Sequence, residues 1–299
     1  MQRLRFLSVG LLLFASCVTD PEGSLDTEEV DFEVLASNGM SLNGMSLNGM
    51  SLNGESLNGM SLSSVSLDHM SLNGKNLIFT SVSNSVLKGM RSGFPLSGAG
   101  LIGSTMQGQA SNGSTVALRV NDIYALPSPN ANVFAYVVEY QNTQGWQPLC
   151  AGANEALVLP GTWNYQTTRH QWDWNLMTLA CRGATFGKCV ELGYKSDLVL
   201  DTYHQACIRA LRADYCGDGQ SHTVDGTQIN IFDKLGTQAD TLPWNIEANW
   251  TPDGATCIDT ARLASTLDGS ESECIHTRAN QVCSTSWSGS VLIRTEVNR

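Results

Sequence analysis

The chain has 299 residues and a formal net charge of −11, from 17 basic and 28 acidic side chains. This acidity disfavours nucleic acid and anionic lipid headgroups as partners. After the N-terminal region, no run of apolar residues is long enough to form a permanent transmembrane helix.

The N-terminus is typical of an export signal. Arg3 and Arg5 precede a short apolar run at 6–15. The run ends in Phe-Ala-Ser-Cys at 14–17, which resembles a bacterial lipobox, and the resemblance implies that Cys17 becomes the first mature residue and carries a lipid. The alternative is an ordinary signal peptide cleaved near Ser16. We expect a lipoprotein signal peptide at 1–17.

An acidic segment follows the signal peptide. Seven acidic residues and no basic residue lie between Asp20 and Glu33. Such a run is typical of a solvated tether, so we expect a linker at 18–35.

A five-residue repeat, Met-Ser-Leu-Asn-Gly, begins at Met40, and its leucine recurs every fifth residue from Leu42 to Leu77. A period of five fits neither a helix nor a flat strand, and Asn-Gly favours a turn. The repeat resembles the pentapeptide-repeat family, and the resemblance implies a right-handed β-solenoid with four repeats per coil. We therefore expect a solenoid at 36–93, in which residues twenty apart, such as Met70 and Met90, stack. The alternative is a low-complexity linker of Ser, Asn and Gly.

The remaining cysteines indicate disulfides. Without Cys17 an even number is left, all in the C-terminal half, and in an exported chain this pattern predicts a disulfide framework. The candidates are Cys150, Cys181, Cys189, Cys207, Cys216, Cys257, Cys274 and Cys283. Their connectivity does not follow from sequence. We suggest that Cys274 pairs with Cys283, and that the segment 181–189 is joined to Cys207 and Cys216.

Residues 94–299 are expected to form one disulfide-rich domain with strands and a main helix near 201–215. Asp201 could cap this helix, and Gly217 could stop it. Its apolar stripe consists of Tyr203, Cys207, Ile208 and Leu211. A short helix is expected at 184–194. Strands are expected at 114–120, 133–140, 175–180, 228–232, 246–250 and 291–297. The predicted fold class is α+β, mostly β, with the solenoid preceding this domain.

The end of the main helix carries a family signature. Residues 213–216 read Ala-Asp-Tyr-Cys, and Gly-Asp-Gly follows at 217–219. With the blocks around Cys189, 247–250 and 254–257, this segment resembles the ADYC domain family, over most of residues 94–260. That family has no assigned activity, so the resemblance implies a type of domain without a mechanism.

Three kinds of chemistry are conceivable beside this signature. Asp214, Asp218 and His222 could act as general acid and base on a glycan or peptide. Cys207 with His204 or His222 could be a nucleophile and its base, although an even set of cysteines leaves no spare thiol. His204, Asp218 and His222 could hold a metal, but their spacing matches no standard ligand pattern, so no metal and no cofactor is predicted. The remaining interpretation is a purely structural helix end.

The tryptophans offer a separate candidate. They could form a platform on which a carbohydrate stacks, or they could fill the core. The residues concerned are Trp163, Trp172, Trp174, Trp244 and Trp250.

Together these features predict a lipoprotein of the bacterial cell envelope, anchored in the outer membrane or at the cell surface, or otherwise secreted. Its expected role is binding or surface structure, with the membrane as a partner through the lipid and an envelope glycan or protein as a further partner. The alternative is an anchored or secreted hydrolase acting on envelope glycan or peptide, and whether the protein is an enzyme stays open.

Overall fold

The fold was analysed in a computed structural model of the chain. It describes residues 40–41, 56–57, 60–150, 155–164, 167–224, 226–240, 243–267, 272–287 and 289–298. The expected signal peptide, the lipidation site Cys17 and the acidic linker lie outside the described residues. No helix in the described part of the chain is long and apolar enough to cross a membrane.

The first half of the described chain forms a closed, six-stranded antiparallel β-barrel. The strands pair in the ring order β10-β12-β15-β3-β8-β9, and β9 returns to β10. Because the sheet closes on itself, each of the six strands pairs with a neighbouring strand on both sides over at least part of its length. Their bounds are β3 Met60–Leu72, β8 Ser104–Ala110, β9 Thr115–Ala125, β10 Phe134–Asn142, β12 Glu155–Pro160 and β15 Leu176–Cys181. Short strands extend this sheet: β2 (Ser56–Leu57) and β4 (Lys75–Asn76) pair with β3, and β11 (Gly145–Pro148) pairs with β10.

The expected fold class, with its pentapeptide solenoid at 36–93, is wrong: the structure is mostly β, and its repeats contribute a barrel strand. Met70 is buried in the barrel, whereas Met90 pairs with Ile78 in another sheet, so the predicted stacking does not occur. The Asn-Gly turn is present, since Asn73 and Gly74 both have positive φ between β3 and β4. The period of five therefore reflects something other than coils.

The leucine period is accommodated by irregularities in β3. Residues five apart in an unbroken strand point to opposite faces of a sheet. The pairing of β3 with β8 shifts register between Leu62 and Ser64 and again between Ser66 and Ser71. Each register shift exchanges the face of the sheet to which the following side chains point. As a result, Leu62, Leu67 and Leu72 are all buried.

Residues 78–97 form a three-stranded antiparallel sheet outside the barrel: β5 (Ile78–Ser83), β6 (Val86–Arg91) and β7 (Phe94–Ser97). Val82 and Leu87 belong to the same buried cluster as the barrel interior. The backbone N–H of Leu87 donates to the Tyr136 hydroxyl at 2.9 Å. This hydrogen bond fastens the small sheet to barrel strand β10. A 3₁₀ turn, η1 (Gly98–Leu101), leads back into the barrel.

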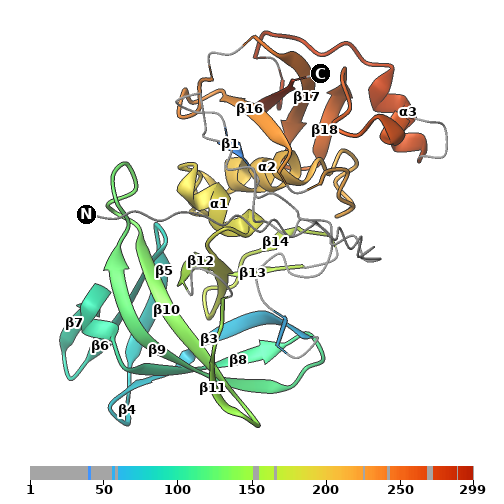
Figure 1. Cartoon of the computed structure of the whole chain (residues 1–299). Coiled ribbons are helices and arrows are strands. Elements are labelled where there is room, and N and C mark those ends of the chain that lie inside the picture. The colour runs from blue at the N-terminus through green and yellow to red at the C-terminus, as the bar shows by residue number, and fades with distance from the viewer. Residues whose placement is uncertain are drawn as a thin grey trace, which may run out of the picture. The chain divides into compact units, whose positions relative to one another are not determined.

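The second half of the chain contains a five-stranded sheet in the order β1-β16-β19-β17-β18. Its bounds are β1 Met40–Ser41, β16 Gln228–Asp233, β17 Asn245–Thr251, β18 Gly254–Ile258 and β19 Ile293–Val297. Helices α1 (Thr185–Glu191) and α2 (Asp201–Arg212) lie between this sheet and barrel strands β12 and β15 (Figure 1). Because β12 and β15 are covered on both faces, they read as nearly continuous apolar runs. A short helix, α3 (Glu273–Ala279), and a 3₁₀ turn, η2 (Ala264–Leu267), lie between β18 and β19 in sequence.

Helix α2 confirms the main helix predicted near 201–215, with two differences at its ends. At the N-terminus the helix has no side-chain cap, because Asp201 is its first residue. The Asp197 carboxylate instead accepts the backbone N–H groups of Val199 and Leu200, which precede the helix. At the C-terminus Ala213 adopts the left-handed conformation that ends the helix, with φ of 50°. Gly217, expected to stop the helix, lies further along the chain.

All eight candidate cysteines form disulfides: Cys150–Cys181, Cys189–Cys207, Cys216–Cys274 and Cys257–Cys283. The suggested pairing of Cys274 with Cys283 is wrong. The suggestion for segment 181–189 is correct for Cys189 with Cys207, which joins α1 to α2, whereas Cys181 pairs within the barrel.

Candidate functional site

The three residues proposed for acid–base chemistry follow α2, but they do not share an open site. Asp214 is completely buried against Arg209, and it accepts the backbone N–H groups of Asp218 and Gly219. Asp218 is exposed, and its carboxylate accepts the N–H of Gln220 at 2.9 Å. The half-buried ring of His222 packs on Tyr215, with 5.6 Å between centroids, and within the described structure it bonds to neither carboxylate. The Asp214 carboxylate and the backbone N–H of Asp218 therefore belong to one hydrogen-bonded turn.

The thiol interpretation is wrong, because Cys207 is oxidised to a disulfide with Cys189. His204 is completely buried, and its Nδ1 bonds to the carbonyl oxygen of Tyr194. Burial lowers the pKa of His204 to about 4, against a smaller opposing effect of that hydrogen bond. In the described part of the chain no three His, Cys, Asp or Glu side chains gather closely enough to hold a metal ion.

The tryptophans divide into core and surface residues. Trp163 and Trp250 are buried, and Trp244 is half-buried. Trp172 and Trp174 are 38% and 64% exposed. Exposed indoles are uncommon enough on a soluble surface to mark a candidate binding site.

These two exposed tryptophans continue a column of rings that begins in the core. Trp163 packs on Phe186 at 4.8 Å and stacks on His170 at 4.6 Å between centroids. His170 contacts Trp172 edge-on at 4.6 Å, and Trp172 lies 5.4 Å from Trp174. Each ring restricts the next, so the two outer indoles are held in place by packing.

His170 is the fixed point of this column. It lies in β14 (His170–Gln171), which pairs with β13 (Thr162–Trp163). Its Nε2 donates to the carbonyl of Pro160 at 2.9 Å, and its Nδ1 lies 2.7 Å from the Asp201 carboxylate. Burial alone would raise the pKa of Asp201, but the hydrogen bond and charge of His170, with a hydrogen bond from Ser196, hold that pKa below its usual value. Sequence reasoning missed this role of His170, because Pro160 and Asp201 lie in other segments of the chain.

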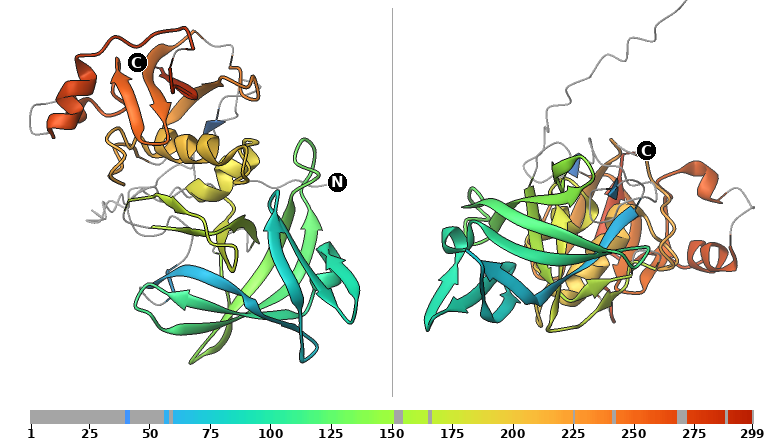
Figure 2. Two further views of the ribbon diagram at one scale, coloured as in Figure 1. Left: turned by 180° about the vertical axis from the view of Figure 1, so that it is seen from behind. Right: turned by 90° about the horizontal axis from the view of Figure 1, so that it is seen from below.

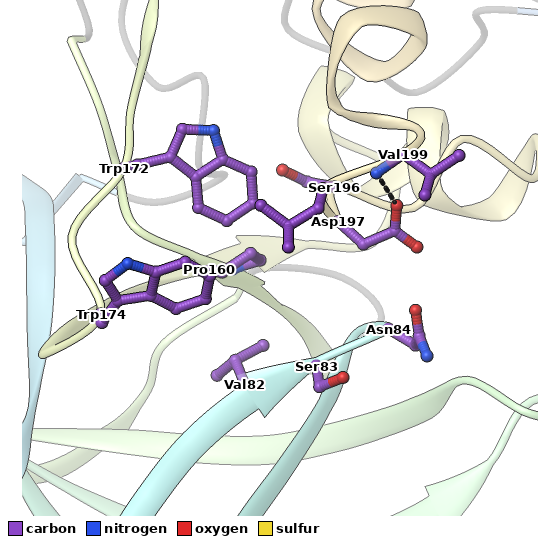
Figure 3. Close-up of a pocket in the computed structure, with 10 residues that line it drawn as sticks. Val82, Ser83, Asn84, Pro160, Trp172, Trp174, Ser196, Asp197 and Val199 are labelled. Carbon is purple, nitrogen blue, oxygen red and sulfur yellow. Dashed lines mark hydrogen bonds between the residues drawn. The ribbon is translucent and has the colours of Figure 1, made fainter.

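The outer indoles line one wall of a pocket of about 220 Å³ (Figure 3). The loop 196–199 before α2 lines the opposite wall, and its Asp197 carboxylate is directed away from the indoles and accepts the Val199 N–H (Figure 3). Ser83 and Asn84, at the turn between β5 and β6, lie at a third side. The volume is below the roughly 300–1,000 Å³ typical of drug-sized ligands, so it suits a single ring-sized group. Apolar indole faces opposite hydroxyl and amide groups are suited to a ligand that is both apolar and polar.

Comparison with known protein families identifies the domain that carries this pocket. The ADYC domain matches residues 98–264, which is more than half of the chain. The chain belongs to the ADYC domain family. No curated protein and no solved structure matches it. The match does not extend to the repeats, and a pentapeptide-repeat assignment is unsupported.

The four residues that name the ADYC domain are all structural in this chain. Ala213 ends α2, and Asp214 neutralises Arg209. The Tyr215 hydroxyl donates to Glu247 at 2.8 Å and accepts the backbone N–H of Arg262 at 2.9 Å, while its ring stacks on Trp250. Cys216 forms a disulfide with Cys274. The signature therefore marks the junction between α2 and the five-stranded sheet.

The junction contains a second buried ion pair. Arg262 and Glu247 are both fully buried, 2.7 Å apart, and the same guanidinium donates to the last carbonyls of α2 at Ala210 and Leu211. Glu247 also accepts the hydroxyl of Thr295, which in turn accepts the Trp250 indole N–H. A buried polar network of this kind is stable only when its members are paired.

The four disulfides of this ADYC protein are consistent with an extracellular or envelope location, because such bonds persist in oxidising compartments.

Proposed function

We propose that this protein is a binding protein of the cell envelope, and that its ligand is an envelope glycan held in the pocket beside Trp172 and Trp174. The observation that carries the proposal is the pair of partly exposed indoles, 5.4 Å apart and fixed by a column of buried rings. The apolar face of a sugar ring packs on an indole, and its hydroxyl groups need hydrogen-bonding partners nearby. Ser196 and Asn84 carry such groups on the other sides of the pocket.

The proposal includes attachment to the membrane through a lipid on Cys17. The lipobox-like Phe-Ala-Ser-Cys sequence and the disulfide set both favour an exported, anchored protein. Mass spectrometry of the mature N-terminus tests this part. An acylated Cys17 supports it, and an unmodified N-terminus at another residue contradicts it.

The hydrolase alternative has little support from the described geometry. Asp214 is enclosed by Arg209, Thr168 and two backbone amides, so it cannot reach a substrate without unfolding the turn. Asp218 and His222 do not bond to each other, which leaves a general acid without a positioned partner.

The test is a titration with soluble peptidoglycan fragments, followed by tryptophan fluorescence and by calorimetry. We expect saturable binding that is weakened at least tenfold by Trp174→Ala. Trp287→Ala is the matched control, because Trp287 is 37% exposed and lies outside the pocket. Equal affinities for the two variants would contradict the proposal. Steady release of new reducing ends or amino groups would instead favour the hydrolase.

A further inference from the structure

The surface of the small sheet β5–β7 differs in charge from the rest of the chain. Between Asp68 and Asp122 the sequence has no acidic residue, but it contains Lys75, Lys88, Arg91 and Arg119. Arg119 pairs with Glu139 on the barrel. Among the described residues, Lys75, Lys88 and Arg91 form no ion pair. A locally cationic surface is therefore present on a protein whose net charge is −11.

Large apolar side chains lie exposed beside these cations. Phe79 is 77% exposed, Phe94 is 73% exposed and Ile78 is 50% exposed. Two exposed phenylalanines within one small sheet are unusual, because they gain nothing from folding when water still surrounds them. Their exposure indicates a surface that is covered by something else.

The geometry brings the cations and the aromatic side chains together. Lys75, Arg91 and Phe94 line one depression, with Asn73, Ser92 and Leu96, and none of the described residues that line it is a carboxylate. Arg91 lies opposite Phe94 in the pairing of β6 with β7, so these two side chains lie on the same face of the small sheet. β6 and β7 are at the periphery of the structure in every view (Figures 1 and 2). We call the set Lys75, Arg91 and Phe94 the β5–β7 patch.

We propose that the β5–β7 patch docks on the surface of a lipid bilayer that contains anionic lipids. Exposed phenylalanines enter the boundary between headgroups and acyl chains, and adjacent Lys and Arg side chains bind the negative headgroups. The charge complementarity is local, since the chain as a whole is acidic and would be repelled by the same surface. This contact is independent of a ligand in the tryptophan pocket and of a lipid on Cys17.

The test is co-sedimentation of the full chain carrying Cys17→Ser, which cannot be lipidated, with vesicles of phosphatidylcholine alone or mixed with phosphatidylglycerol. We expect binding to the anionic vesicles that exceeds binding to neutral vesicles and decreases as salt is added. Near an anionic membrane each cation contributes about a fivefold factor in affinity, so Lys75→Gln with Arg91→Gln should weaken binding about 25-fold. Phe94→Ser should weaken binding to both kinds of vesicle by about tenfold.

Matched controls come from exposed residues elsewhere. Lys234→Gln removes an exposed cation, and Val282→Ser removes an apolar side chain that is 94% exposed. Both should leave vesicle binding unchanged, as should Trp174→Ala, which affects the proposed glycan pocket alone. A thermal melt of each variant checks that the fold is intact.

Three results would overturn the proposal. One is that the parent and the Gln variants all bind neutral and anionic vesicles equally well. Another is binding to a soluble anionic polysaccharide without binding to vesicles. A third is a change in sedimentation coefficient for the Phe94→Ser variant without a change in vesicle binding, which would make the β5–β7 patch an interface between copies of the chain.

Discussion

The Asp214 carboxylate lies against the Arg209 guanidinium, and both side chains are completely buried at the end of α2. Burial lowers the pKa of Arg209, and the charge of Asp214 raises it part of the way back. The buried Arg209 charge therefore depends on Asp214 for its compensation. This relationship gives the acidic residue of the signature a structural role in this chain.

Neutralising Asp214 should destabilise the protein strongly. Asp214→Asn leaves the Arg209 charge buried without its partner, so the free energy of unfolding should fall by about 3 kcal/mol. Asp218→Asn is the matched control, because Asp218 is exposed and its amide variant can still accept the Gln220 N–H, and it should change stability by less than about 0.5 kcal/mol. Urea unfolding followed by circular dichroism measures both. Equal losses for the two variants would refute a structural role specific to Asp214.

Removing the Tyr215 hydroxyl should also be costly. Burial, and then the charge of Glu247, raises the pKa of Tyr215 well above 10, so the hydroxyl stays protonated and donates to that carboxylate. Tyr215→Phe leaves Glu247 and the backbone N–H of Arg262 each short of one partner, and we expect a loss of about 2 kcal/mol. Tyr203→Phe, at a partly exposed ring on α2, should cost less than about 0.5 kcal/mol. Thermal unfolding of the two variants checks the difference.

His204 should make stability depend on pH. Its pKa is about 4 when folded and about 6.5 when unfolded, so below pH 6.5 the unfolded chain binds a proton that the folded protein rejects. Stability is therefore lost as pH falls from about 6.5 to about 4, by about 3 kcal/mol for this group. His204→Asn keeps a donor for the Tyr194 carbonyl and should flatten this part of the profile. His276→Asn, at an exposed histidine, should leave the profile unchanged.

Breaking a disulfide should destabilise the protein more when the loop that the disulfide closes is longer. Cys216–Cys274 spans 58 residues and Cys189–Cys207 spans 18. The chain-entropy relation gives about 4 kcal/mol for the longer loop and about 3 kcal/mol for the shorter one. Denaturant unfolding of the paired alanine variants tests the values. The unreduced, denatured parent should show no thiol from these eight cysteines in a titration, and detection of several would contradict the bonding pattern.

The parts of the fold that could be predicted depend on local patterns. The apolar stripe of α2 and the strands around 133–140 and 246–250 are visible because side chains alternate with a helical or strand period. The disulfide set followed from the even number of cysteines, but the pairing of Cys150 with Cys181 is set by barrel closure, which leaves no local trace.

The repeat was misread for a physical reason. A regular five-residue spacing of leucine fits a solenoid corner, but it also fits a strand that alternates two- and three-residue steps. β3 takes the second solution, with a register shift between successive buried leucines. Sequence alone does not distinguish the two, because both bury leucine once per repeat.

The candidate site, like the fold, could be predicted only in part from the sequence. Trp172 and Trp174 could be nominated from their density in the sequence, but not separated from the buried Trp163 and Trp250. Asn84 and Asp197 are more than 100 residues apart, and only the completed fold brings them to the same pocket. Asp214, by contrast, was noticed for its charge, and its burial could not be read from the chain.

The position of β19 has a consequence for biogenesis. β19 lies between β16 and β17, which do not pair with each other. As the polypeptide emerges from a ribosome or a translocation channel, those two earlier strands stay unjoined until residues 293–297 arrive. The sheet of this half is therefore completed only after residues 293–297 have been made, and a nascent chain stalled before Ile293 should remain sensitive to protease there.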